Sequence, residues 1–204
     1  MSYLGQGEVA LEKFIKKIVD KQIYENRIAE EDKNIYLYGY TLLFEVLINI
    51  VIAIIIGIIT RRFLMIFVFL CNYIPLRSFC GGWHADRLWK CTIYSNLTLI
   101  CLIVMYNCCS DRFTEVTMIL IYAVCMVFVL LYSPMDTKSK VISDKERVKY
   151  KKVIITVMFI HTFVLIVSVL YGSKDIEFIL MFVYVLQMIM LVPGVINKYT
   201  ENKA

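Results

Sequence analysis

The sequence predicts an all-α, polytopic membrane protein with about six transmembrane helices and an amphipathic N-terminal helix at the membrane interface. Of its 204 residues, 60% are hydrophobic and only 19% are charged, against roughly 45–50% and about 25% in soluble domains. The apolar residues gather in runs that approach or reach the roughly 17–25 residues that a helix needs to cross the hydrocarbon of a bilayer. Lys and Arg concentrate in alternate connections between these runs. A soluble domain and a nucleic-acid-binding protein are therefore poor interpretations.

The first element is the N-terminal segment, residues 1–40, which precedes the transmembrane domain of residues 41–204. Its apolar and charged residues fall on opposite faces of a predicted helix; the apolar face holds Leu11, Phe14, Ile15 and Ile18, and the charged face holds Glu12, Lys13, Lys16, Lys17, Asp20 and Lys21. Such a helix either lies in the cytoplasmic interface or packs on the cytoplasmic ends of the bundle. Because the first apolar run begins only after this charged segment, we expect no cleavable signal peptide.

Five apolar runs are long enough to predict membrane spans directly: 42–59, 92–109, 116–133, 153–171 and 177–196. The sixth run, residues 63–76, has only 14 residues before Arg77. It crosses the bilayer if its helix continues through Arg77, and otherwise it is re-entrant.

The distribution of positive charge predicts the orientation of these spans. With six spans, the N-terminal segment, residues 77–90, residues 138–152 and the C-terminal tail share one side with 18 Lys and Arg, and the other side has 4. Cytoplasmic connections carry the excess of Lys and Arg. We therefore expect both termini to lie in the cytoplasm.

The connection after the sixth run contains the residues best suited to chemistry. His84 and Cys91 form a candidate base and nucleophile, but seven residues of straight helix would separate them by about 10.5 Å along its axis. The chain must therefore bend, and Gly81 and Gly82 provide a permissive backbone before His84. A helix that begins between these glycines would return the imidazole toward Cys91, and its N-terminus would stabilise a thiolate.

Two other interpretations of the same residues remain open. Cys80, His84 and Cys91 have a spacing that a metal site tolerates, although no fourth ligand is evident. A small transporter is the other alternative, although the sequence shows no inverted repeat. His161 lies within an apolar run and is predicted to be a hydrogen-bonded core histidine, and no cofactor is expected.

The remaining cysteines favour no disulfide framework, because seven is an odd number and their spacing is irregular. Cys71, Cys101 and Cys125 lie within apolar runs and are expected to be small buried side chains.

The pattern Arg77-x3-Gly81-Gly82-x-His84-Ala85-x5-Cys91 resembles the accessory gene regulator B (AgrB) family of bacterial quorum-sensing peptidases. A second block, residues 134–140 with the basic run to Lys152, is similar to that family's proline–aspartate–threonine–lysine loop. The resemblance implies a membrane cysteine endopeptidase with Cys91 as nucleophile and His84 as base. It also implies two partners: a small precursor peptide with an amphipathic N-terminus and an acidic C-terminal tail, and a second copy of the chain in a homodimer.

Four more residues receive possible roles beside this pair. Arg77 could hold a substrate carboxylate or could anchor its helix at the interface. Asp136 could orient His84, as the third member of a catalytic triad does, or could only turn the chain after Pro134. Lys138 and Lys140 are expected to attract the acidic tail of the precursor.

Overall fold

The computed structural model describes residues 6–82, 88–136 and 142–201, which are helical apart from short turns. No strand occurs among these residues. The seven α-helices are α1 (Gln6–Tyr24), α2 (Lys33–Ile59), α3 (Phe63–Cys80), α4 (Leu88–Cys109), α5 (Glu115–Tyr132), α6 (Asp144–Tyr171) and α7 (Lys174–Glu201), with short 3-10 turns at Glu30–Asp32 and Ser110–Arg112.

Six of the helices, α2 to α7, are long and apolar enough to cross a membrane. The predicted all-α architecture with six spans is confirmed on this criterion. The segment with only 14 apolar residues is part of α3, which continues through Arg77 and ends at Cys80. Its 18 residues reach the length that a membrane-spanning helix requires.

The chain forms two compact units, of which the first contains residues 1–55 and 86–96. Within it, α1 lies against α2. The rings of Phe14 and Phe44 meet edge to face at 5.7 Å, and the Lys33 ammonium pairs with Asp20 at 2.8 Å. The N-terminal segment is thus helical, but α2 already begins at Lys33. Its position at a membrane interface stays a prediction.

The predicted apolar face of α1 is only partly buried. Ile15 and Val19 are buried, whereas Phe14 is 53% exposed. The buried face of α1 therefore includes Val19, which the sequence analysis did not place there, and leaves Phe14 largely exposed.

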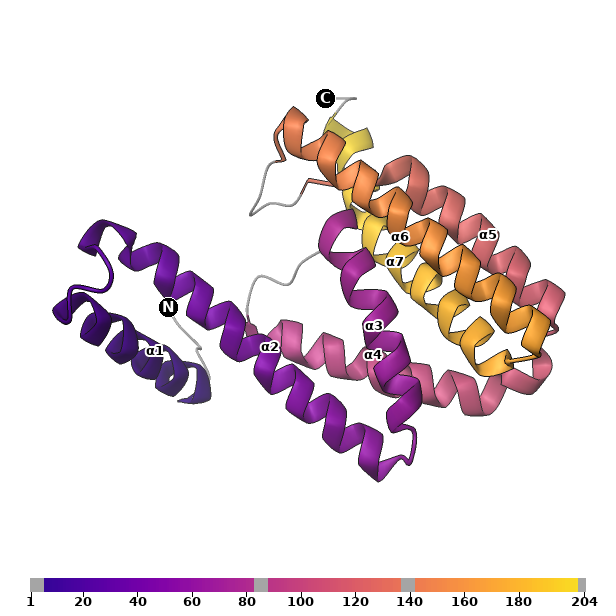
Figure 1. Cartoon of the computed structure of the whole chain (residues 1–204), viewed down its shortest axis with the longest axis horizontal. Helices are drawn as coiled ribbons and strands as arrows, with labels where there is room; N and C mark the ends of the chain where they lie inside the picture. Colours follow the sequence, from indigo (N-terminus) through magenta and orange to yellow (C-terminus); the bar gives the residue numbers. More distant parts are fainter. Residues whose placement is uncertain (1–5, 83–87, 137–141, 202–204) are drawn as a thin grey trace. The chain divides into compact units, whose positions relative to one another are not determined.

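The second unit contains residues 56–85 and 97–204, and α7 lies at its centre. This helix contacts α3, α5 and α6, and α5, α6 and α7 lie side by side (Figure 1). Residues 178–184 of α7 are all buried, as expected of a helix that is apolar on every side. The outer faces of α5 and α6 instead expose large apolar side chains, which suits contact with lipid.

Local sequence signals determine where α6 begins and ends. Ser143 and Glu146 form a reciprocal capping box at its N-terminus, and Gly172 ends it in the left-handed conformation. This start places Arg147 and Lys151, four residues apart, on the same face of the first turns.

Candidate functional site

Two segments that are distant in the sequence meet where α3 ends. The N–H of Met135 donates a hydrogen bond of 2.9 Å to the carbonyl of Cys80, and Gly81 and Met135 form an isolated parallel β-bridge. The Gly81–Gly82 segment is therefore fixed against the segment that follows α5.

Both glycines adopt conformations that other residues rarely take. Their φ angles are +70° at Gly81 and +112° at Gly82. A Cβ atom on Gly81 would lie 2.3 Å from the carbonyl oxygen of Met135, and one on Gly82 would lie 2.7 Å from that of Met190. Backbone conformation and close packing both require glycine at these positions.

The bend expected at the two glycines is present, and neither glycine is helical. The predicted helix start also involves residues 83–87, which lie outside the described residues. The helix α4 begins at Leu88. Positive φ angles are incompatible with a right-handed helix, and the pairing with Met135 holds the segment in a different path.

Two side chains donate to the carbonyl of Gly81. The Arg77 guanidinium binds it from one turn back in α3, and Nε2 of Gln187 in α7 donates to it at 3.2 Å. Gln187 is fully buried. Arg77 is therefore directed into the protein, where it supports the backbone just before His84. Sequence reasoning missed Gln187, whose signal is a lone amide in the apolar run 177–196.

The carboxylate of Asp136 binds two groups at the start of α6. Arg147 pairs with it at 2.7 Å, and the N–H of Ile142 donates to it at 3.0 Å. Arg147 also donates to the carbonyl of Pro134 at 3.1 Å. These contacts hold Asp136 against the start of α6. Its possible role toward His84 stays a prediction, because His84 lies outside the described residues.

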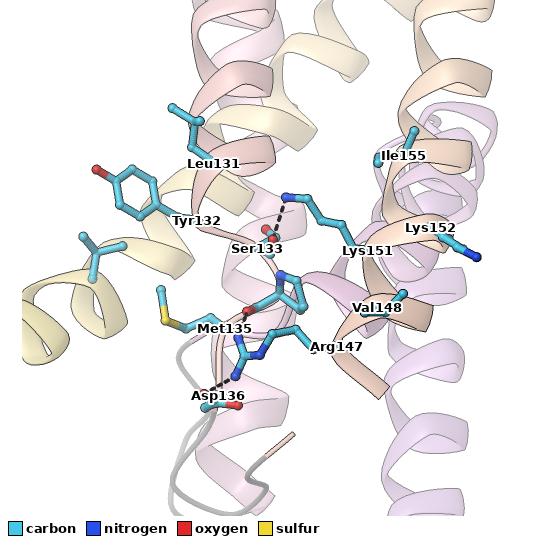
Figure 2. Close-up of a pocket in the computed structure, with 12 residues that line it drawn as sticks. Leu131, Tyr132, Ser133, Met135, Asp136, Arg147, Val148, Lys151, Lys152 and Ile155 are labelled. Carbon is cyan, nitrogen blue, oxygen red and sulfur yellow. Dashed lines mark hydrogen bonds and ion pairs between the residues drawn. The ribbon is translucent and has the colours of Figure 1, made fainter. Parts of the chain in front are cut away.

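Lys151 binds the end of α5. Its ammonium donates to the carbonyl of Ser133 at 2.8 Å, as drawn in Figure 2, and also to the carbonyl of Leu130. A cation at this position stabilises a helix C-terminus, where backbone carbonyls lack helical partners. Sequence reasoning assigned neither Arg147 nor Lys151 a structural role, although their spacing of four along α6 was the available signal.

The proposed catalytic residues are only partly covered by the described structure. Cys91 is the fourth residue of α4 and is half-buried. His84, Lys138 and Lys140 lie outside the described residues. Among the residues that are described, no three His, Cys, Asp or Glu side chains gather as a metal site would need. The metal-site alternative depends on His84, so it is not tested by this finding.

The structure also tests the predicted burial of His161 and of three cysteines. His161 is buried and its Nδ1 lies 3.3 Å from the Tyr184 hydroxyl, so the prediction of a hydrogen-bonded core histidine is confirmed. Cys125 is buried as expected. Cys71 and Cys101 are exposed, so their expected burial is wrong. An apolar residue of a membrane-spanning helix can face either lipid or the protein core. The sequence of an apolar run does not show which of the two it faces.

Comparisons with known proteins agree with the motif in the chain. The sequence model of the family described as Accessory gene regulator B matches residues 11–191. A protein of Clostridium perfringens (strain SM101 / Type A) named "Putative AgrB-like protein" is 29% identical over 168 residues, which are 78% of each chain. "Putative AgrB-like protein 2" of Clostridium perfringens (strain 13 / Type A) is 28% identical over 168 residues, with the same coverage. No solved structure matches this chain.

Proposed function

Because this chain belongs to the accessory gene regulator B family, we propose that it is a membrane-embedded cysteine endopeptidase that matures a quorum-sensing peptide. Membership of the family supports a role in processing such peptides. The observation that carries the finer proposal is the pattern Gly81-Gly82-x-His84-Ala85-x5-Cys91 inside the matched region. It combines a nucleophile, a base and a glycine bend in one short connection.

In the proposed reaction, Sγ of Cys91 attacks the carbonyl carbon that joins the signal core to the acidic tail. His84 takes the thiol proton and passes it to the leaving amine of the tail. The C–N bond breaks, and the core remains as a thioester on Cys91. A thiol within the core then attacks this thioester, the C–S bond to Cys91 breaks, and a thiolactone ring closes. A substrate serine would give a lactone by the same exchange.

The position of Cys91 supports its role as nucleophile. It lies in the first turn of α4, where backbone N–H groups without helical partners stabilise an anion. A cysteine reacts as its thiolate, so this position favours attack. Exclusion of water from the acyl-enzyme would preserve the thioester until the ring closes.

The backbone before His84 is supported from three sides. Met135 pairs with Gly81, Arg77 binds the Gly81 carbonyl from α3, and Gln187 binds the same carbonyl from α7. A base must be held within hydrogen-bond reach of its nucleophile to act efficiently. We assign these contacts the task of holding the segment that leads into His84.

The proposed substrate and orientation rest on the distribution of charge, and the proposed bacterial membrane rests on the family resemblance. Lys138 and Lys140 would attract an acidic leaving tail at the cytoplasmic surface. The proposed enzyme lies in the bacterial cytoplasmic membrane with both termini inside, acts as a homodimer as its family resemblance implies, and needs no cofactor.

Co-expression with a candidate precursor tests this proposal, because loss of the acidic tail changes the precursor mass. Mass spectrometry should detect tail removal with the wild-type chain and none with Cys91→Ala or His84→Ala. The double variant should be no worse, because residues that act as one unit are not additive. The variant Cys80→Ala should keep most activity; its complete inactivity would favour the metal-site alternative.

A further inference from the structure

An open pocket of about 710 Å³ lies beside the segment that joins α5 to α6, and the proposed reaction does not use it. The residues that line it come from α5, the following segment, α6 and α7 (Figure 2): Leu131, Tyr132, Ser133, Pro134, Met135, Asp136, Arg147, Val148, Lys151, Lys152, Ile155 and Val195. All of them belong to the second unit.

The pocket carries an excess of positive charge. Three cations, Arg147, Lys151 and Lys152, and one carboxylate, Asp136, line it, so their net charge is +2. Arg147 is neutralised by Asp136 at 2.7 Å. Lys151 donates to two carbonyls, which orient its ammonium without cancelling its charge. Among the described residues, no carboxylate pairs with Lys151 or Lys152.

Apolar side chains make up much of the rest of the lining, and two of them, Leu131 and Ile155, lie in helices that could span a membrane. Leu131 is 71% exposed at the end of the apolar run 116–133. Ile155 lies at the start of the run 153–171 and is also exposed. Lys151 and Lys152 immediately precede that second run. In a bilayer, the cations would therefore lie where the hydrocarbon gives way to headgroups, and exposed apolar side chains continue along α5 and α6.

We propose that this pocket binds one anionic phospholipid, with its phosphate at Lys151 and Lys152 and an acyl chain against Leu131 and Ile155. Basic pockets between transmembrane helices are suited to anionic headgroups. Lysine side chains reach the interface while their stems cover apolar surface. An acidic peptide fits less well, because the exposed apolar side chains of the lining belong to predicted membrane spans. Acyl chains, rather than water, would surround these side chains in a bilayer. This inference is independent of the proposed peptidase activity.

The test is a titration of the full chain in detergent with phosphatidylglycerol, in which native mass spectrometry counts bound lipid. Phosphatidylcholine provides the comparison without net charge. Lys152→Gln should weaken phosphatidylglycerol binding about fivefold, since one lysine near an anionic headgroup contributes about that factor. Lys149→Gln is the matched control, because it removes the same charge from an exposed position on α6 that does not line the pocket. It should change binding less than about twofold.

A second variant tests the acyl-chain contact. Leu131→Trp partly fills the pocket from an exposed position and should reduce lipid binding without unfolding the chain. Equal effects of Lys152→Gln and Lys149→Gln, or unchanged binding by Leu131→Trp, would overturn the proposal. Competition by inorganic phosphate as effective as that by lipid would reassign the pocket to free phosphate. Displacement of the lipid by an acidic peptide at lower concentration than by phosphatidylglycerol would reassign it to a peptide.

Discussion

The buried amide of Gln187 donates a hydrogen bond of 3.2 Å to the carbonyl of Gly81, across 106 positions of sequence. Gln187 belongs to the central helix α7, and Gly81 is three residues before His84. The same carbonyl accepts from Arg77. The backbone before the proposed base is thus attached directly to the centre of the second unit.

Replacing Gln187 should therefore reduce catalysis more than it reduces folding. Gln187→Leu removes one of the two donors to Gly81 and should lower precursor cleavage about fivefold, because a hydrogen bond of this kind contributes about 1 kcal/mol. The thermal unfolding temperature should fall only slightly, since leucine is apolar and of similar size. A variant that cleaves precursor at the wild-type rate would show that this contact does not support the reaction.

Alanine at Gly81 should destabilise the protein far more than alanine at Gly172. Both glycines have φ near +70°, but a Cβ on Gly81 would meet a backbone oxygen at 2.3 Å, whereas nothing lies within 4 Å of one on Gly172. Gly172→Ala should cost about 1 kcal/mol from the backbone conformation alone. Gly81→Ala should cost more than about 2 kcal/mol. Thermal unfolding in detergent compares the two, and equal losses would contradict the close approach at Met135.

Asp136 should act through the start of α6 and not as a third catalytic residue. Asp136→Asn and Arg147→Gln should each reduce cleavage by a similar few-fold factor, and the double variant should add little, because the two side chains form one ion pair. Both are about 40% exposed, so the pair contributes less than about 1 kcal/mol to stability. Complete loss of cleavage by Asp136→Asn, with Arg147→Gln still active, would instead identify Asp136 as the residue that orients His84.

The predicted orientation can be tested by labelling from outside intact cells. In a background without native cysteines, a membrane-impermeant thiol reagent should label Lys174→Cys and should not label Lys145→Cys. Both positions are exposed, and they lie near opposite ends of α6. The reverse pattern would contradict the orientation inferred from the 18 to 4 charge asymmetry. It would also place the proposed site on the wrong side for a cytoplasmic precursor.

Much of the fold could be predicted because the bilayer restricts which secondary structures a spanning segment can adopt. A spanning segment must satisfy its own backbone hydrogen bonds, so the length of an apolar run nearly determines a helix. The bend at Gly81 and Gly82 was also predictable, since two adjacent glycines permit positive φ angles.

The contacts that surround this bend could not be predicted from local pattern. The bonds from Gln187 to Gly81 and from Lys151 to Ser133 depend on which faces of α3, α5, α6 and α7 meet. The same limit explains Cys71 and Cys101, because an apolar run does not reveal whether a residue faces protein or lipid.

The central claim is that Cys91 carries the acyl group during maturation of the precursor. The most direct measurement is capture of the precursor–enzyme adduct, followed by treatment with hydroxylamine, which cleaves thioesters. The wild-type chain and Cys80→Ala should each form a hydroxylamine-sensitive adduct, and Cys91→Ala should form none. An adduct that persists in Cys91→Ala would contradict the proposed mechanism.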